Sequence, residues 1–184
     1  MKRRKALKLT AAICGGTIAG SRYFLSGCKN NETTIGLFST EDIALMDDIG
    51  ETILPATADS PGAKAARIGD FMKTIVTDCY SEKEQQAFLQ GLGEIKRLAD
   101  EVYKHPFREL TPSEKKDLLS GLDRDAPDIE GEEIPHYFSM MKQLTIWGYF
   151  TSEPGATRAL RYNPVPGRYL ACIPYKVGDK AWAE

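Results

Sequence analysis

Apolar residues recur at helical spacing along most of this 184-residue chain, and helix-start signals divide them into separate runs. Ser39 begins a run that Pro55 ends, and the segments 81–84 (SEKE) and 111–114 (TPSE) are capping boxes. An apolar residue every three or four positions gives a helix one face to bury against its neighbours. The chain is therefore predicted to be all-α, a small bundle of about five helices forming a single domain over residues 39–184.

The sequence predicts the ranges of five helices and indicates which of them are weakened or strongly apolar. Their expected ranges are 39–54, 65–79, 81–102, 111–122 and 135–148. Gly91 and Gly93 should weaken the third helix by roughly 1 kcal/mol each relative to alanine. The last helix is the most apolar, and its stripe of aromatic and sulfur side chains, Trp147 included, is expected in the core. Residues 151–184 are rich in Pro, Gly and Tyr and are predicted to be irregular, lying over a surface of this chain or of a partner.

Residues 1–27 have the composition of an export signal. They carry six basic residues and no acidic one, and five of the six precede the apolar stretch 9–20, which is too short to span a membrane. Arg3 and Arg4 begin a partial twin-arginine motif, although a basic start serving the general secretion route is the alternative. Leu25-Ser26-Gly27-Cys28 resembles a lipobox, so Cys28 is expected to carry lipid after cleavage. The chain is thus predicted to be exported and lipid-anchored on the periplasmic side of a membrane, with residues 28–38 as a tether.

Export changes what the cysteines can do. Once the signal has left and Cys28 is lipidated, Cys79 and Cys172 remain in an oxidising compartment. These two could pair, and a bond closing so long a loop would stabilise by about 4–5 kcal/mol in the chain-entropy view. The alternative is two separate thiols that behave as small apolar side chains.

Charge and motif content exclude several classes of function. Residues 28–184 carry 18 basic and 26 acidic residues, which argues against a nucleic-acid-binding protein. The chain has no dinucleotide or P-loop fingerprint, no haem-attachment motif and no zinc spacing. Its two histidines lie outside any nucleophile motif, and the acidic segment 123–133 lacks the spacing of a calcium loop. The residues therefore predict no catalytic, cofactor-binding or metal-binding group in this chain.

Three segments together resemble the small, third subunit of gluconate 2-dehydrogenase-type flavoprotein complexes. They are 51–57 (ETILPAT) with 61–63 (PGA), 148–153 (GYFTSE) with Gly155, and 162–169 (YNPVPGRY). The resemblance implies a large partner of the glucose-methanol-choline oxidoreductase type, which holds FAD and oxidises a sugar or sugar acid. It implies that a cytochrome c subunit can take the electrons onward, and that the small subunit has no redox centre of its own.

The resemblance also implies a role for the export signal, which would carry the folded, flavin-loaded large subunit across the membrane. The small subunit would also support the stability of the large one. Expected contacts with that partner are Tyr149, Phe150, Tyr162, Arg168 and Tyr169, unless these residues only fold the chain's own tail. A free-standing envelope lipoprotein that binds another partner is the alternative, and an enzyme with an unrecognised carboxylate site is a third.

Overall fold

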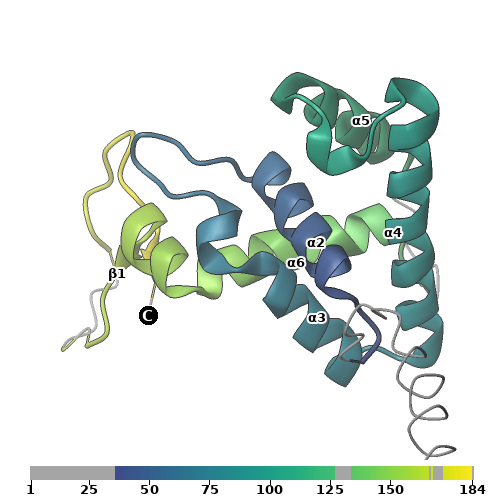
Figure 1. Cartoon of the computed structure of the whole chain (residues 1–184). Coiled ribbons are helices and arrows are strands. Elements are labelled where there is room, and N and C mark those ends of the chain that lie inside the picture. The colour runs from purple at the N-terminus through teal and green to yellow at the C-terminus, as the bar shows by residue number, and fades with distance from the viewer. Residues whose placement is uncertain (1–35, 127–133, 166, 168–171, 184) are drawn as a thin grey trace, which may run out of the picture. The chain divides into compact units, whose positions relative to one another are not determined.

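The computed structural model describes residues 36–126, 134–165, 167 and 172–183, and it confirms the all-α prediction. Within these residues there are five α-helices (Figure 1): α2 (Thr40–Ile53), α3 (Ile68–Cys79), α4 (Glu82–Tyr103), α5 (Pro112–Asp125) and α6 (Tyr137–Thr151). The shorter elements are η1 (Ala63–Ala66), η2 (Phe107–Glu109), η3 (Gly155–Ala159), β1 (Arg161–Tyr162) and β2 (Trp182–Ala183).

Three helices begin at the residues that the sequence indicated. Ser81 and Thr111 form the predicted capping boxes, in which each hydroxyl accepts from the backbone N–H three residues on. Ser39 forms a third box with Asp42, whose carboxylate accepts from the Ser39 N–H at 3.0 Å. Each box supplies partners to N–H groups that a helix start otherwise leaves unbonded. The N-terminal ends of α2, α4 and α5 are therefore set by local sequence.

The predicted second helix is wrong at its start. Arg67 has φ 53° and ψ 52°, so a left-handed residue separates the 3-10 turn η1 from α3. Its backbone N–H bonds to the Lys64 carbonyl, which closes η1 and redirects the chain. A continuous apolar period cannot reveal such a break, because η1 and α3 bury their apolar residues in the same core.

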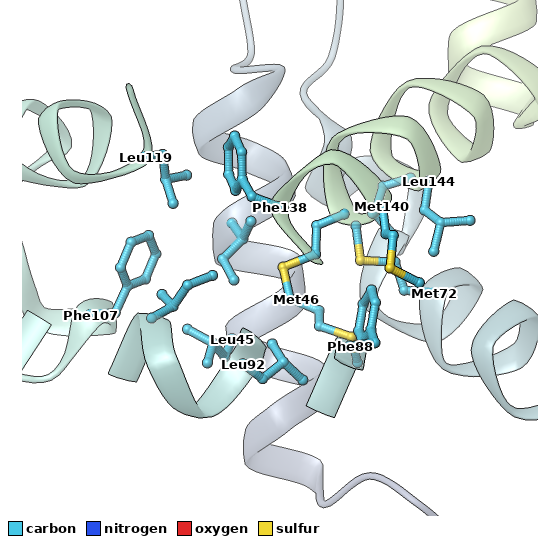
Figure 2. Packing of buried hydrophobic residues seen from close by; sticks show 14 of the residues in the cluster. Leu45, Met46, Met72, Phe88, Leu92, Phe107, Leu119, Phe138, Met140 and Leu144 are labelled. Carbon is cyan, nitrogen blue, oxygen red and sulfur yellow. The ribbon is translucent and has the colours of Figure 1, made fainter. Parts of the chain in front are cut away.

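The core gathers around α6, which packs against α2, α3, α4 and α5. Figure 2 shows buried side chains from these helices together with Phe107 of η2: Leu45, Met46, Met72, Phe88, Leu92, Phe107, Leu119, Phe138, Met140 and Leu144. Two glycines allow the helices to come close. A Cβ at Gly148 would lie 2.5 Å from the Phe71 ring, and one at Gly91 would lie 2.4 Å from the Tyr137 ring. The buried side chains of these helices therefore interlock across short distances.

Two boundaries in the structure differ from the predicted ones: the start of the helical domain and the end of α5. Phe38, placed in the tether, is 1% exposed, and its ring lies edge-on to Phe88 with centroids 6.0 Å apart. The helical domain thus begins before Ser39. At the other end, α5 continues to Asp125, and Asp123 pairs with Lys142 of α6 at 2.6 Å. Two acids of the acidic segment 123–133, Asp123 and Asp125, therefore belong to a helix, and the ion pair of Asp123 joins that helix to α6.

The C-terminal segment has more regular structure than predicted. After α6 the chain makes one π-helical turn, η3, and β1 then pairs in parallel with β2 (Figure 1). Arg161 lies opposite Trp182 in this pairing, and Tyr162 lies opposite Ala183. Two-residue strands carry no recognisable period, so only the pairing itself could reveal them.

Among the described helices, none combines the length and the apolar character that crossing a membrane requires.

Candidate functional site

The loop between α2 and η1 is held at both ends by one carboxylate. Glu51 Oε1 accepts from the Ala56 N–H, and its Oε2 accepts from the Lys64 N–H, both at 2.9 Å. The absence of a side chain at Gly62 makes room for this carboxylate, since a Cβ there would lie 2.1 Å from Oε1. The loop 54–62 is thereby closed against the end of α2, and we call it the pinned loop.

Tyr149 of α6 joins the pinned loop from the other side. Its hydroxyl donates to the Pro61 carbonyl and lies 2.5 Å from Ser60 Oγ, while its ring is only 3% exposed. Two of the three segments that carry the family resemblance, 51–63 and 148–155, therefore meet here. Tyr149, which was expected to contact a partner, is thus buried in this chain, where its hydroxyl bonds to the pinned loop.

The chain turns tightly just after Tyr149. Ser152 Oγ donates to the Tyr149 carbonyl at 2.6 Å and accepts from the Gly155 N–H at 3.2 Å. A Cβ at Gly155 would lie 1.8 Å from the Tyr149 carbonyl oxygen, so no larger residue fits this turn. Gly155 thus serves the close backbone approach that η3 requires.

Charged groups fix η1 and η2 to α2. The Asp48 carboxylate, 12% exposed, bonds Lys64 Nζ and Arg108 Nε, each at 2.9 Å. Burial opposes ionisation of Asp48, but the hydrogen bonds from Lys64 and Arg108 outweigh it and hold its pKa below the usual value. The same contact raises the pKa of the Lys64 ammonium. One carboxylate therefore joins three elements that are distant in sequence.

Three apolar side chains on the outer side of α6 lie exposed beside this region. Ile146, Trp147 and Phe150 form what we call the α6 surface, with exposed fractions of 38%, 57% and 36%. The Trp147 ring lies edge-on to Phe71 of α3, with centroids 6.1 Å apart. Trp and Phe are residue types that contribute strongly to protein–protein interfaces. The α6 surface is thus the part of this helix that is suited to contact another protein.

The exposure of Trp147 corrects the prediction that its side chain lies in the core. Because α6 is apolar on nearly every side, its sequence could not say which side faces the core. The available signal was the pair of adjacent residues 146 and 147 followed by Phe150, which places three large apolar groups on one side of the last two turns. Phe150 and Tyr162 are exposed, as a partner contact would require.

Several predicted sites lie outside the described residues: Arg3, Arg4, Cys28, Arg168 and Tyr169. Cys79 and Cys172 are both free and exposed, so the structure does not contain the disulfide that they could have formed. Cys79 ends α3, whereas Cys172 lies in the C-terminal segment.

The described residues bring together no group of three or more His, Cys, Asp or Glu side chains that could hold a metal ion. His136 caps α6, its Nδ1 accepting from the Phe138 N–H at 3.3 Å. His105 is exposed, 4.0 Å from Glu109. A cavity of about 330 Å³ lies between α2, α5 and α6, and the Asp123–Lys142 ion pair lines it. Asp123 and Lys142, two of the three charged residues that line this cavity with Lys116, therefore neutralise each other.

Comparison with known families gives one match. The family described as gluconate 2-dehydrogenase subunit 3 matches residues 40–167, which include the pinned loop, all of α2 to α6, and β1. No curated protein and no solved structure matches the chain.

Proposed function

The chain belongs to the gluconate 2-dehydrogenase subunit 3 family, and from this we propose that it is the non-catalytic small subunit of a flavin-dependent dehydrogenase. Its large partner, of the glucose-methanol-choline oxidoreductase type, would bind FAD and oxidise a sugar or sugar acid. A cytochrome c subunit would carry the electrons onward. The small subunit would bind the large subunit and stabilise it.

The observation that carries this proposal is the α6 surface. Trp147 and Phe150 lie exposed at the end of a helix whose other faces are packed, next to a loop that Glu51 and Tyr149 hold in place. A partner that covers these side chains would remove apolar area from water at small entropic cost, because the backbone beneath them is already ordered. Rigid aromatic anchors of this kind suit a lasting complex.

Other observations support a role without chemistry of its own. His136 uses its ring in a helix cap, and Asp48 and Asp123 are paired with cations. The redox chemistry is therefore assigned to the partner subunit.

The proposal extends to the first 28 residues. Arg3 and Arg4 would direct folded protein to twin-arginine export, so that a large subunit bound to this chain crosses the membrane with it. The thiol of Cys28 would then take up lipid and hold the complex on the periplasmic side. In this arrangement one small chain supplies both the export address and the anchor.

Affinity isolation of the full chain from membranes tests the proposal. With a tag on a flexible linker after Glu184, the wild-type chain should bring down a large protein with a flavin absorbance spectrum. Trp147→Asp should reduce its recovery by about tenfold or more, since a charge placed in an apolar interface disrupts it. Val102→Asp is the matched control, because Val102 is 63% exposed on α4 and should leave recovery unchanged.

Two results would contradict the proposal. Recovery of the wild-type chain without any flavoprotein would favour a free-standing envelope lipoprotein. If the double variant R3K/R4K still exported this chain together with the flavoprotein, the proposed escort role would be wrong. The complex of the two proteins could still form in that case.

A further inference from the structure

The cavity between α2, α5 and α6 is lined by one side of α5 and one side of α6. Its volume is about 330 Å³, and the end of α2 also contributes to it. The lining residues of α5 share one side of that helix, because they recur at helical spacing: Lys116, Leu119, Ser120 and Asp123. Three residues of α6, each four positions from the next, line the cavity as well. The cavity is therefore built from regular helices, and its shape depends on how they pack.

The inner wall of this cavity is apolar and belongs to the core. Leu119 and Phe138 are only 4% and 2% exposed. Ile53 and Leu54, at the end of α2, pack against the same core, and Ile146 of the α6 surface completes the apolar lining. Ligand sites in proteins combine such an apolar wall with a few polar groups that fix the orientation of the ligand. A hydrocarbon group bound here would be removed from water.

The charged residues that line the cavity leave one cation without a partner. Asp123 Oδ1 and Lys142 Nζ lie 2.6 Å apart and neutralise each other. Among the residues that the structure describes, none forms a hydrogen bond or an ion pair with Lys116. Ser120, one turn along α5 from Lys116, adds a hydroxyl to the same lining. The cavity therefore has an unbalanced positive charge, which an anion would complement.

Lys116 also lines a second cavity, of about 420 Å³, in which the other charged groups are bonded within the chain. Asp48 pairs with two cations, and Glu51 accepts from two backbone N–H groups. Lys115 Nζ donates to the Arg108 carbonyl at 3.1 Å. Of the described charged residues in the two cavities, Lys116 is thus the one left unpaired. An anionic group that entered either cavity would meet the same ammonium group.

We propose that the cavity between α2, α5 and α6 binds a small organic anion with a hydrocarbon body. The hydrocarbon would lie against Leu119 and Phe138, and the anionic group would accept a hydrogen bond from Lys116 Nζ. The cavity volume is at the lower end of the range for ligand sites, so it suits a single short chain. A free fatty acid and an anionic membrane lipid share this chemistry. The site goes beyond the proposed function, because it requires no contact with the flavoprotein subunit.

Isothermal titration calorimetry of the full chain carrying Cys28→Ala tests this inference, because a chain without the lipid can be studied without detergent. The probes are octanoate, its uncharged analogue octanol, and octanoyl lysophosphatidylglycerol. Octanoate should bind about fivefold more tightly than octanol, because only the anion can pair with Lys116. Lys116→Gln should remove that difference. Lys73→Gln, on α3 and outside both cavities, should retain it.

A second pair of variants tests the place of binding. Ser120→Phe puts a ring into the cavity from an exposed position of α5, so it should lower the affinities for octanoate and octanol by about tenfold. Ser113→Phe makes the same change at an exposed position in the first turn of α5 and should leave both affinities unchanged. Circular dichroism and melting temperature should show that each variant is folded.

Several outcomes would overturn the inference. Equal binding of octanoate and octanol, or no binding of either anion below about 1 mM, would show that the cavity is not an anion site. Octanoate binding that is unchanged in Lys116→Gln or in Ser120→Phe would place the ligand elsewhere. If both variants lose affinity as expected, the inference stands. The tighter-binding anion, octanoate or octanoyl lysophosphatidylglycerol, then identifies the ligand as a free acid or a membrane lipid.

Discussion

Gly91 and Gly93 are two residues apart on α4, yet the structure gives them opposite roles. From sequence, both glycines were expected to weaken the helix equally. Gly91 is buried, and a Cβ there would enter the Tyr137 ring, whereas a Cβ at Gly93 would meet nothing within 4 Å. Only Gly91 therefore serves the contact between α4 and α6.

These two positions make a matched pair of variants. Gly91→Ala should lower the free energy of unfolding by about 1–3 kcal/mol, because the Tyr137 ring must move to make room. Gly93→Ala should raise it by about 0.5–1 kcal/mol through helix propensity alone. Chemical denaturation of the two variants measures both values. Equal effects would mean that Tyr137 does not pack on Gly91 as described.

The effect of removing a tyrosine hydroxyl likewise depends on the contacts that the fold gives it, as Tyr149 and Tyr162 illustrate. Tyr149→Phe keeps the ring in the core but leaves Ser60 and the Pro61 carbonyl without that partner. We expect a loss of about 1–2 kcal/mol in unfolding free energy and faster proteolysis in the pinned loop. Tyr162→Phe, at a half-exposed ring, should stay within about 0.5 kcal/mol of the wild type. An unchanged Tyr149→Phe variant would show that the hydroxyl does not hold the loop.

At the scale of elements, a few charges organise the packing that apolar residues drive. Asp48 joins α2 to η1 and η2, and Asp42 joins α2 to Lys96 of α4 at 2.7 Å. Burial opposes ionisation of Asp42 as well, but the bonds from Lys96 and Ser39 outweigh it and lower its pKa. The elements of this bundle are thus joined by carboxylates that must remain ionised.

The lowered pKa of Asp48 gives stability a defined dependence on pH. A carboxyl whose folded pKa lies below its ordinary value of 3.8 stabilises the fold above that pH. This stability is lost as the pH falls through the folded pKa. Asp48→Asn should therefore cost about 1–2 kcal/mol at pH 7, and its deficit should shrink below about pH 4.

Thermal melts of Asp48→Asn and of wild type between pH 7 and pH 2 would measure this. Asp117→Asn, at an exposed position of α5, is the control and should follow the wild type throughout. A deficit that stayed constant with pH would show that the carboxylate's charge contributes nothing.

At the scale of the whole molecule, the chain combines segments with different expected fates. Residues 1–27 carry six basic residues and no acidic one, whereas residues 28–184 carry 18 basic and 26 acidic residues. If Cys28 carries the lipid, Cys28→Ala should move most of the chain from the membrane to the soluble fraction. Cys14→Ala, which changes a thiol inside the signal, should not. Membrane association that survives Cys28→Ala would rule out the lipid anchor.

The sequence by itself determined the helical class and most helix ends. Cap residues such as Ser81 and Thr111 bond to backbone groups three residues away, so these features are local and can be predicted from sequence. The family resemblance was also present in short segments, and the match over residues 40–167 confirms it.

The tertiary structure alone decided which apolar residues are buried and how distant segments pair. It exposed Trp147, buried Tyr149 and paired β1 with β2. It also broke the second predicted helix at Arg67. These outcomes depend on which partner each residue meets across the fold. Because α6 is apolar on nearly every side, several rotations about its axis would bury apolar residues equally well. The contacts of Trp147 with Phe71 and of Tyr149 with the pinned loop select one of these rotations.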